Sequence, residues 1–275
     1  MNLRRNGVDS RPQAVQVLTK GETMRKLRLL FVLCAVGGLA TIGSTASAAP
    51  PGAAACSGGT IAAGTYKSLT VTGTCLFGPG TLNVTGNLTV APGATLNDHI
   101  ASSFGVTVHV GGNVLVGQGG VIGLGNYNPV PPHTSAVVDG NVIADQPGTL
   151  YLGGMTIHGN LISNGGSGPG RNFPIKDDTI DGNVILQGWS GLWFGLIRTH
   201  VGGNAVISHM AGSQTGLPGT EFEGILDSTE VVSNTIGGNL ICLANTPVAQ
   251  IGDAAEEGGG PNTVGGNKLG ECAGL

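Results

Sequence analysis

The sequence is poor in charged residues and in aromatic residues. Asp, Glu, Lys and Arg make up 10% of its 275 residues, where roughly 25% is usual in soluble domains. Aromatic residues make up only 4%, yet apolar residues reach 40%, and a disordered segment would instead be poor in apolar residues and rich in charge. No strict Gly-X-Y period is present, which excludes collagen. The composition therefore predicts a folded chain with an apolar core.

A hydrophobic run long enough to cross a membrane comfortably is also missing. Residues 29–42 form an apolar run, but a membrane helix needs roughly 20 residues. The run follows a basic segment at 24–28 and precedes Ala46-Ser47-Ala48, a pattern typical of a secretory signal peptide. We predict a signal peptide at 24–48, cleavage after Ala48, no membrane span in the mature chain, and a secreted or cell-surface location. Because such a signal opens a chain, residues 1–23 are predicted to be a mis-assigned extension.

Basic residues are scarce in the predicted mature chain, which follows residue 48. It holds five of them against 14 acidic residues, a net charge of −9. A nucleic-acid-binding protein needs a basic face that neutralises phosphates and releases counterions. Nucleic acid is therefore excluded as a partner.

Glycine is abundant instead, with 51 residues, and it belongs to a repeat. The repeat is an apolar residue, any residue, Gly, Asn and then mostly apolar residues. Eight copies recur at intervals of 19 to 35 residues. Their Asn residues are Asn87, Asn113, Asn141, Asn160, Asn183, Asn204, Asn239 and Asn267.

Each copy is predicted to be a strand, a sharp turn and a second strand, with Gly supplying a positive φ at the bend. Gly-Asn pairs also make two-residue hairpins, but the long intervals that return to the same pattern indicate a coiling chain. Parallel crossovers are right-handed. We therefore predict an all-β, right-handed parallel β-helix of about 8–10 rungs, as a single domain at 49–275. Its stacked Asn side chains are expected to form a hydrogen-bonded ladder.

Four cysteines follow the predicted signal peptide, and an even number in an exported chain favours disulfides. Cys56 and Cys75 are 19 residues apart, and Cys242 and Cys272 are 30 apart. Each separation matches about one rung, so the cysteines of a pair should lie within disulfide reach. We predict the disulfides Cys56–Cys75 and Cys242–Cys272, one at each end of the solenoid.

The C-terminal residues carry a resemblance to known proteins. Residues 234–242 read Asn-Thr-Ile-Gly-Gly-Asn-Leu-Ile-Cys, 262–268 read Asn-Thr-Val-Gly-Gly-Asn-Lys, and 270–272 read Gly-Glu-Cys. This arrangement resembles a group of exported, Gly-rich solenoid proteins common in actinobacteria, to which no function is assigned. More distantly, the Asn-bearing turn looks like that of pectate-lyase-type β-helices. That likeness concerns the fold alone and carries no catalytic residue across.

Side chains two and four positions before each Asn are predicted to point outward together, since alternate residues of a strand share a face. In the middle rungs this places His158, Asp181 and His200 on neighbouring rungs, which lie about 4.8 Å apart. Two imidazoles and a carboxylate at that spacing suit a divalent metal ion or a proton relay. The alternative is that they are solvated surface residues, and we assign no metal site. A divalent ion is the one cofactor considered.

A second group offers carboxylates for catalysis. Asp177 and Asp178 precede Asp181, and Arg198 precedes His200. Paired carboxylates perform glycoside hydrolysis. However, the Gly-His-Gly and Arg-x-Lys patterns of polygalacturonase-like enzymes are absent. We assign no catalytic residue and favour a non-enzymatic protein.

Two further features suggest contact surfaces. Trp189 and Trp193 are the chain's two tryptophans, and if exposed they would form a platform for stacking a sugar ring. The alternative is that they pack on the solenoid. In six rungs both residues after the Asn are mostly apolar, and because adjacent strand residues face opposite ways, one of these columns faces outward. This predicts an exposed apolar stripe that requires a cover or a partner.

The pattern as a whole favours a secreted or cell-surface structural or interaction protein, with a rigid, non-enzymatic β-solenoid as its scaffold. The alternative is a carbohydrate-binding or polysaccharide-degrading β-helix, a lyase or a glycoside hydrolase, that uses the middle rungs. The expected partners are a cell-wall polysaccharide or another protein.

Overall fold

The computed structural model of the chain describes residues 52–97, 105–126, 135–216, 219, 223–252 and 259–275. The chain divides into two units, Met1–Ala48 and Ala49–Leu275. The predicted extension at 1–23 and the predicted signal peptide at 24–48 lie outside the described residues.

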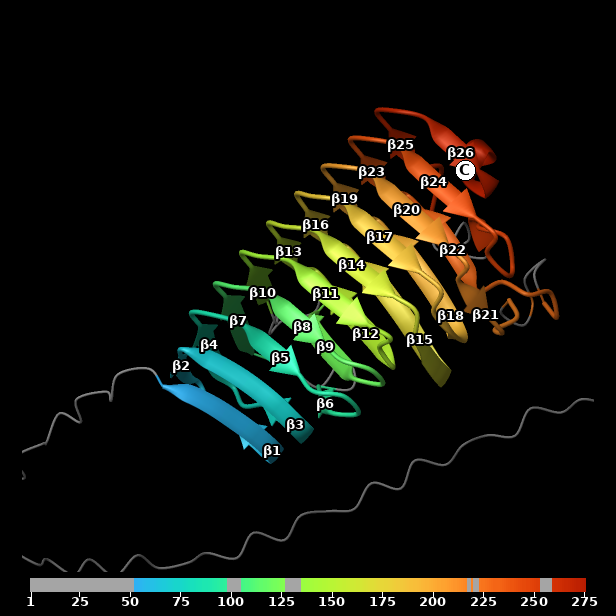
Figure 1. The fold of residues 1–275 in the computed structure, drawn as a ribbon. Helices are drawn as coiled ribbons and strands as arrows, with labels where there is room; N and C mark the ends of the chain where they lie inside the picture. The colour runs from blue at the N-terminus through green and yellow to red at the C-terminus, as the bar shows by residue number, and fades with distance from the viewer. Residues whose placement is uncertain (1–51, 98–104, 127–134, 217–218, 220–222, 253–258) are drawn as a thin grey trace, which may run out of the picture. The chain divides into compact units, whose positions relative to one another are not determined.

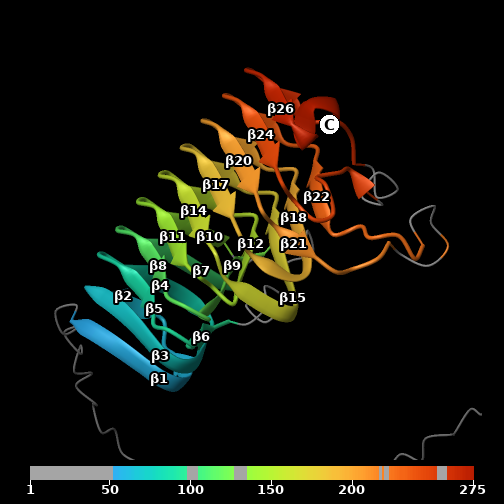
Figure 2. The same ribbon diagram turned by 45° about the vertical axis from the view of Figure 1, so that its right-hand side comes forward.

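The second unit is a right-handed parallel β-helix, as predicted (Figure 1). A complete rung has one strand on each of three faces, and every pairing between successive rungs is parallel, as between β7 and β10 and between β14 and β17. Figure 2 shows the rungs stacked in sequence order along one axis.

Face 1 is a nine-stranded sheet, and each of its strands after the first leads into a Gly-Asn turn. Its strands are β2 (Gly64–Tyr66), β4 (Gly80–Val84), β7 (Val106–Val110), β10 (Ser135–Val138), β13 (Thr156–Ile157), β16 (Thr179–Ile180), β19 (His200–Val201), β23 (Thr235–Ile236) and β25 (Thr263–Val264).

Face 2 follows the Gly-Asn turns. Its strands are β5 (Leu88–Val90), β8 (Val114–Val116), β11 (Val142–Asp145), β14 (Leu161–Asn164), β17 (Val184–Gln187), β20 (Ala205–Ser208), β24 (Leu240–Leu243) and β26 (Lys268–Gly270).

Face 3 completes the rung. Its strands are β6 (Thr95–Leu96), β9 (Val121–Gly125), β12 (Thr149–Gly153), β15 (Ser167–Lys176), β18 (Ser190–Ile197), β21 (Ala211–Gly212) and β22 (Thr229–Val232). The long strands β1 (Ala53–Ile61) and β3 (Ser68–Phe77) run across faces 2 and 3. They join these faces into one 17-stranded sheet.

The core fills the inside of the coil. On face 2 the strands alternate buried, partly buried and buried residues, because successive side chains of a strand point to opposite faces. In the first seven repeats the residue after the ladder Asn points inward, which stacks a fully buried aliphatic column. It consists of Leu88, Val114, Val142, Leu161, Val184, Ala205 and Leu240.

The predicted Asn ladder is confirmed along its whole length. In each of its seven steps, the backbone N–H of one Asn donates to Oδ1 of the Asn in the preceding rung, at 2.8 to 2.9 Å. In the middle rungs the side-chain amide donates to the same oxygen, as from Asn183 to Asn160 at 3.1 Å. The ladder therefore satisfies backbone groups at a turn, where no strand pairing is available.

The reason predicted for Gly in these turns is wrong. None of the eight glycines of the Gly-Asn pairs has a positive φ. Glycine is required by close approach of the preceding rung instead. A Cβ at Gly159 would lie 2.5 Å from the carbonyl oxygen of Gly140 and 2.7 Å from Oδ1 of Asn141.

Both predicted disulfides are present. Cys56–Cys75 links β1 to β3 in the first rungs, and Cys242–Cys272 links β24 to the terminal 3-10 helix η3 (Glu271–Gly274). The described residues contain no helix long and apolar enough to pass through a membrane.

Candidate functional site

The predicted polar residues of face 1 form contacts between neighbouring rungs. His158 Nδ1 lies 2.7 Å from Asp181 Oδ2, and both side chains are half-exposed. A second pair, not predicted, occurs two rungs earlier. His109 Nε2 lies 3.0 Å from Asp139 Oδ2, and His109 Nδ1 lies 3.1 Å from Asn83 Oδ1. The sequence offered the same signal for this second pair, because His109 and Asp139 also stand four and two positions before a ladder Asn.

The predicted three-residue metal cluster is not formed. His200 stands four positions before its ladder Asn, whereas His158 and Asp181 stand two positions before theirs. His200 is in register with Thr179 and Thr235. Although His109 reaches Asp139 across the same two-residue offset, no hydrogen bond or ion pair joins His200 to Asp181 in the part of the chain that the structure describes, and Asp181 contacts His158 instead. Among the residues with described positions, no group of three or more His, Cys, Asp or Glu side chains is arranged to hold a metal ion.

Asp177 and Arg198 form an ion pair in the turns between face 3 and face 1. Arg198 Nε and one terminal nitrogen donate to the two oxygens of Asp177 at 2.6 and 2.8 Å. Both residues adopt a left-handed backbone conformation, with φ of 61° and 50°. They occupy equivalent positions in consecutive rungs, since Lys176 pairs with Ile197 directly before them. The guanidinium thus neutralises the carboxylate that the sequence suggested for catalysis.

Asp178 lies in the wall of the solenoid instead of on a surface. Its side chain is 2% exposed, and Oδ1 accepts a hydrogen bond from the backbone N–H of Met155 at 2.9 Å. Oδ2 is buried and has no hydrogen-bond partner. Burial raises the pKa of Asp178 well above its ordinary value, and the neighbouring Asp177 carboxylate raises it further, against the lowering effect of the Met155 N–H. Asp177 and Asp178 are therefore not the paired, substrate-facing carboxylates that the sequence suggested.

Asp178 belongs to a second set of rung-to-rung hydrogen bonds that the sequence analysis missed. Asn234 Oδ1 accepts from the Thr199 backbone N–H at 2.9 Å, and Asn262 Oδ1 accepts from the Asn234 N–H at 3.1 Å. The Asn234 side-chain amide also donates to the Leu196 carbonyl at 2.8 Å. Asp178 makes the same contact with Met155 that Asn234 makes with Thr199. The available signal was an Asn or Asp five positions before the ladder Asn, as at Asp178, Asn234 and Asn262, but it recurs in only some of the rungs.

Neither tryptophan provides an open platform for a sugar ring. Trp189 is fully buried in the core and donates its indole N–H to the Gly148 carbonyl at 2.9 Å. Its ring centroid lies 5.0 Å from that of Phe173. Trp193 is 7% exposed and covers Gly195, where a Cβ would lie only 2.1 Å from the indole ring. The stacking prediction is therefore wrong for Trp189.

Lys176 closes the outer side of Trp193. Its Nζ lies 4.9 Å from the centroid of the indole ring, in the range of a cation–π contact. Trp193 also packs with Ile197 and Val232 in a small apolar cluster on the outside of face 3. The indole thus serves as a cover of the solenoid wall.

The predicted apolar stripe is present on face 2. It is the outward column two positions after the ladder Asn, and its residues are half-buried or exposed, with Ile185 38% and Leu269 45% exposed. Its members pair from rung to rung without a break. The apolar stripe consists of Leu115, Ile143, Ile162, Ile185, Val206, Ile241 and Leu269.

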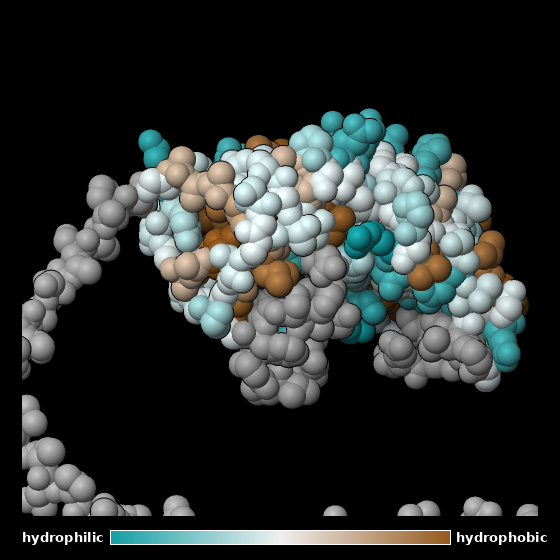
Figure 3. Space-filling view, turned by 90° about the horizontal axis from the view of Figure 1, so that it is seen from below, coloured by the Kyte–Doolittle hydropathy of each residue, from teal (hydrophilic) through white to brown (hydrophobic). Residues whose placement is uncertain are grey.

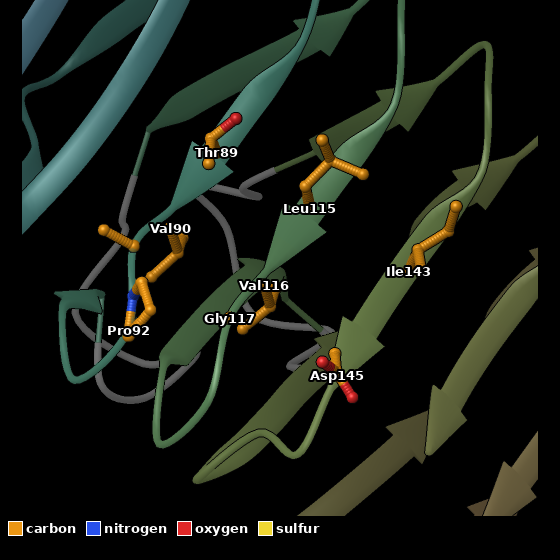
Figure 4. Close-up of a pocket in the computed structure, with 9 residues that line it drawn as sticks. Thr89, Val90, Pro92, Leu115, Val116, Gly117, Ile143 and Asp145 are labelled. Atoms are coloured by element: carbon orange, nitrogen blue, oxygen red, sulfur yellow. The ribbon is translucent and has the colours of Figure 1, made fainter.

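The apolar stripe begins at a shallow depression on the outside of face 2. Leu115 and Ile143 project from neighbouring strands on one side, beside Pro92, Gly117 and Asp145 (Figure 4). Pro92 packs closely against Gly117, where a Cβ would lie 3.0 Å from the proline ring. Seen from another side, the molecule is of mixed hydropathy, with small apolar patches between hydrophilic ones (Figure 3).

Comparisons with protein-family models, with curated proteins and with solved structures find no match for this chain.

Proposed function

We propose that this protein is an exported, non-enzymatic β-solenoid that acts as a rigid scaffold at the cell surface or in the secreted matrix. One observation carries the proposal. Of the ionisable residues that the sequence offered for catalysis, Asp177, Asp178, Asp181 and Arg198 are engaged in contacts between rungs, as in the pairs His158–Asp181 and Asp177–Arg198. A catalytic acid or base must instead reach the proton that it transfers.

Two further observations support a durable extracellular scaffold. The disulfides Cys56–Cys75 and Cys242–Cys272 suit an oxidising compartment. They cross-link the first and last rungs, where a solenoid is otherwise prone to fraying and to edge-to-edge pairing. The ladder of eight Asn residues ties the intervening rungs together.

The proposal is tested on the protein recovered from cells that express the full chain. We expect the mature protein in the medium or in the cell-wall fraction, with Ala49 as its first residue by mass spectrometry of intact protein. Incubation with a panel of neutral and uronic polysaccharides, with and without divalent cations, should release no oligosaccharides above the level of a heat-unfolded sample.

Two results would contradict the proposal. One is retention of the chain inside the cell with residues 24–48 still attached. The other is turnover of any polysaccharide that is lost in both Asp181→Asn and His158→Gln. A matched control is Thr179→Ser, which changes an outward residue of the same face without touching either ion pair.

A further inference from the structure

We infer that face 2 is a homodimer interface, on which the apolar stripe of one copy packs against the apolar stripe of a second copy. The inference builds on the proposed scaffold function and adds its partner. The stripe contains seven aliphatic residues in seven consecutive rungs. Soluble monomers seldom expose a contiguous apolar patch of this kind without a partner.

The distribution of charge favours meeting through face 2. Its two outward columns lie two and four positions after the ladder Asn, and between Thr89 and Gly270 they contain a single ionisable residue, Asp145. The corresponding outward columns of face 1 contain five. They are His109, Asp139, His158, Asp181 and His200.

Net charge makes this difference decisive. The chain after residue 48 carries a net charge of −9, so two copies repel one another at most relative orientations. Contact through face 2 brings together and desolvates fewer ionisable groups than contact through face 1. The apolar stripe is therefore a surface on which two copies associate at a lower electrostatic cost than through face 1.

The spacing of the rungs favours a second copy over another apolar partner. Side chains of the stripe repeat at the inter-rung distance, about 4.8 Å. A second copy has the same period, so its side chains can enter the gaps between those of the first along the entire stripe. A two-fold axis in the interface plane places stripe on stripe and closes the assembly as a dimer.

The available area predicts an association of moderate strength. The apolar stripe is about 33 Å long, which is six inter-rung steps plus the width of one side chain. The face 2 strand, from the ladder Asn to the column four positions after it, gives the contact surface a width of about 16 Å. Two copies would bury about 1,000 Å² in total, which is the lower end of specific protein interfaces. The dimer should therefore dissociate in the micromolar range and not in the nanomolar range.

Sedimentation equilibrium of the mature protein over a range of micromolar concentrations tests the inference. The parent should show a reversible monomer–dimer equilibrium. The double variant Ile162→Lys, Ile185→Lys places two charges in the centre of the stripe and should weaken dimerisation by about 100-fold or more, because like charges would face each other across the interface. The matched control is Thr156→Lys, Thr179→Lys, which adds the same charges to outward positions of face 1 in the same two rungs.

The control variant should dimerise like the parent, and thermal melting should show that both variants are folded. If the stripe variant does not fold, Ile162→Thr, Ile185→Thr replaces it, because Thr is β-branched and suits a strand; it should weaken dimerisation by about tenfold. A parent that remains monomeric at every concentration would overturn the inference, as would a stripe variant that dimerises as well as the control. Parent monomers that bind apolar vesicles or another protein through the stripe would also overturn it. None of these outcomes tests the proposed scaffold function. That proposal is contradicted by retention of the chain inside the cell or by polysaccharide turnover.

Discussion

The Gly-Asn turn and the turn between faces 3 and 1 close the same rungs in different ways. The first carries Asn in all eight repeats and a continuous ladder. The second carries Asn234 and Asn262 in late rungs, but Met155, Asp178 and Thr199 at the equivalent place in others. A parallel solenoid thus tolerates varied residues at one turn when the hydrogen-bonding groups of the other turn are paired in the same way in every rung.

The largest expected effect is steric and concerns the Gly-Asn turn. Gly159→Ala should destabilise the protein by about 3 kcal/mol, because its Cβ would lie 2.5 Å from the Gly140 carbonyl oxygen and the overpacked turn must shift. The control is Gly58→Ala, where the nearest atom to the new Cβ is 3.9 Å away and φ is not positive. Urea denaturation followed by circular dichroism measures both. Equal urea midpoints for the two variants would mean that the rungs can separate at the Gly-Asn turn without a loss of folding free energy.

The next effect concerns the ladder side chains. Asn160→Ala should cost about 1–3 kcal/mol, because Asn160 accepts two hydrogen bonds from Asn183 and donates two to Asn141, and the groups left behind are partly buried. Asn183→Ala should behave similarly. Asn267→Ala should cost less, since Asn267 is exposed and its ladder contacts run only to Asn239. Identical denaturation midpoints for all three variants and the parent would contradict a stabilising role for the ladder.

The smallest effect concerns the turn between faces 3 and 1, and it is a stabilisation and not a destabilisation. Asp178→Asn should stabilise the protein by about 1 kcal/mol at neutral pH. In a later rung, the Asn234 amide at the equivalent position donates to the carbonyl of Leu196. The acceptor that corresponds to Leu196 in the rung before Asp178 is the carbonyl of Leu152. Leu152 pairs with Ile175 as Leu196 pairs with Val231. An amide at this position satisfies that acceptor without a buried charge.

The pH dependence follows from the raised pKa of Asp178 in the folded state. Below its ordinary value near 3.8, the carboxyl is protonated in both the folded and the unfolded state, and its contribution to stability is intact. As the pH rises from there toward the folded pKa, only the unfolded state loses its proton, so this contribution is progressively lost, and above the folded pKa both states are ionised and the loss no longer grows. The advantage of Asp178→Asn should therefore grow with rising pH and shrink toward pH 4. Thermal melts of parent and variant across this range check it, and an advantage that is constant with pH would contradict it.

The regular part of this molecule was predictable, and the irregular part was not. The Asn column and the cysteine spacings indicate rungs, a ladder and two end disulfides, because these features repeat at one position of each rung. The hydrogen-bonding role of Asp178 was not predicted, although its position, five residues before a ladder Asn, is the same as that of Asn234 and Asn262. The residue type varies at this position from rung to rung, and one residue separates the partly buried Asp177 from the buried Asp178.

The position of His200 was predicted, since it faces outward four residues before its ladder Asn, but its side-chain contacts were not. Whether Trp189 enters the core was not predictable, because it lies on face 3, where no repeated residue fixes which alternate side chain points inward. The apolar stripe was predictable as a column, whereas its exposure and its lack of charge depend on what flanks it. The outward column four positions after the ladder Asn, which contains Asp145, is seen to flank the apolar stripe only once face 2 is assembled.

The central claim is that the outward His and Asp residues of face 1 are contacts of a scaffold and not ligands of a metal or a substrate. The direct test is thermal melting of the parent and of the triple variant His158→Thr, Asp181→Thr, His200→Thr, with and without zinc and other divalent ions. We predict no metal-dependent shift in the parent and a change of less than about 1 kcal/mol in the variant, because the lost ion pair is exposed and Thr suits an outward strand position. A rise of several degrees with zinc in the parent, absent from the variant, would show that the folded state binds the ion at these residues and would contradict the claim.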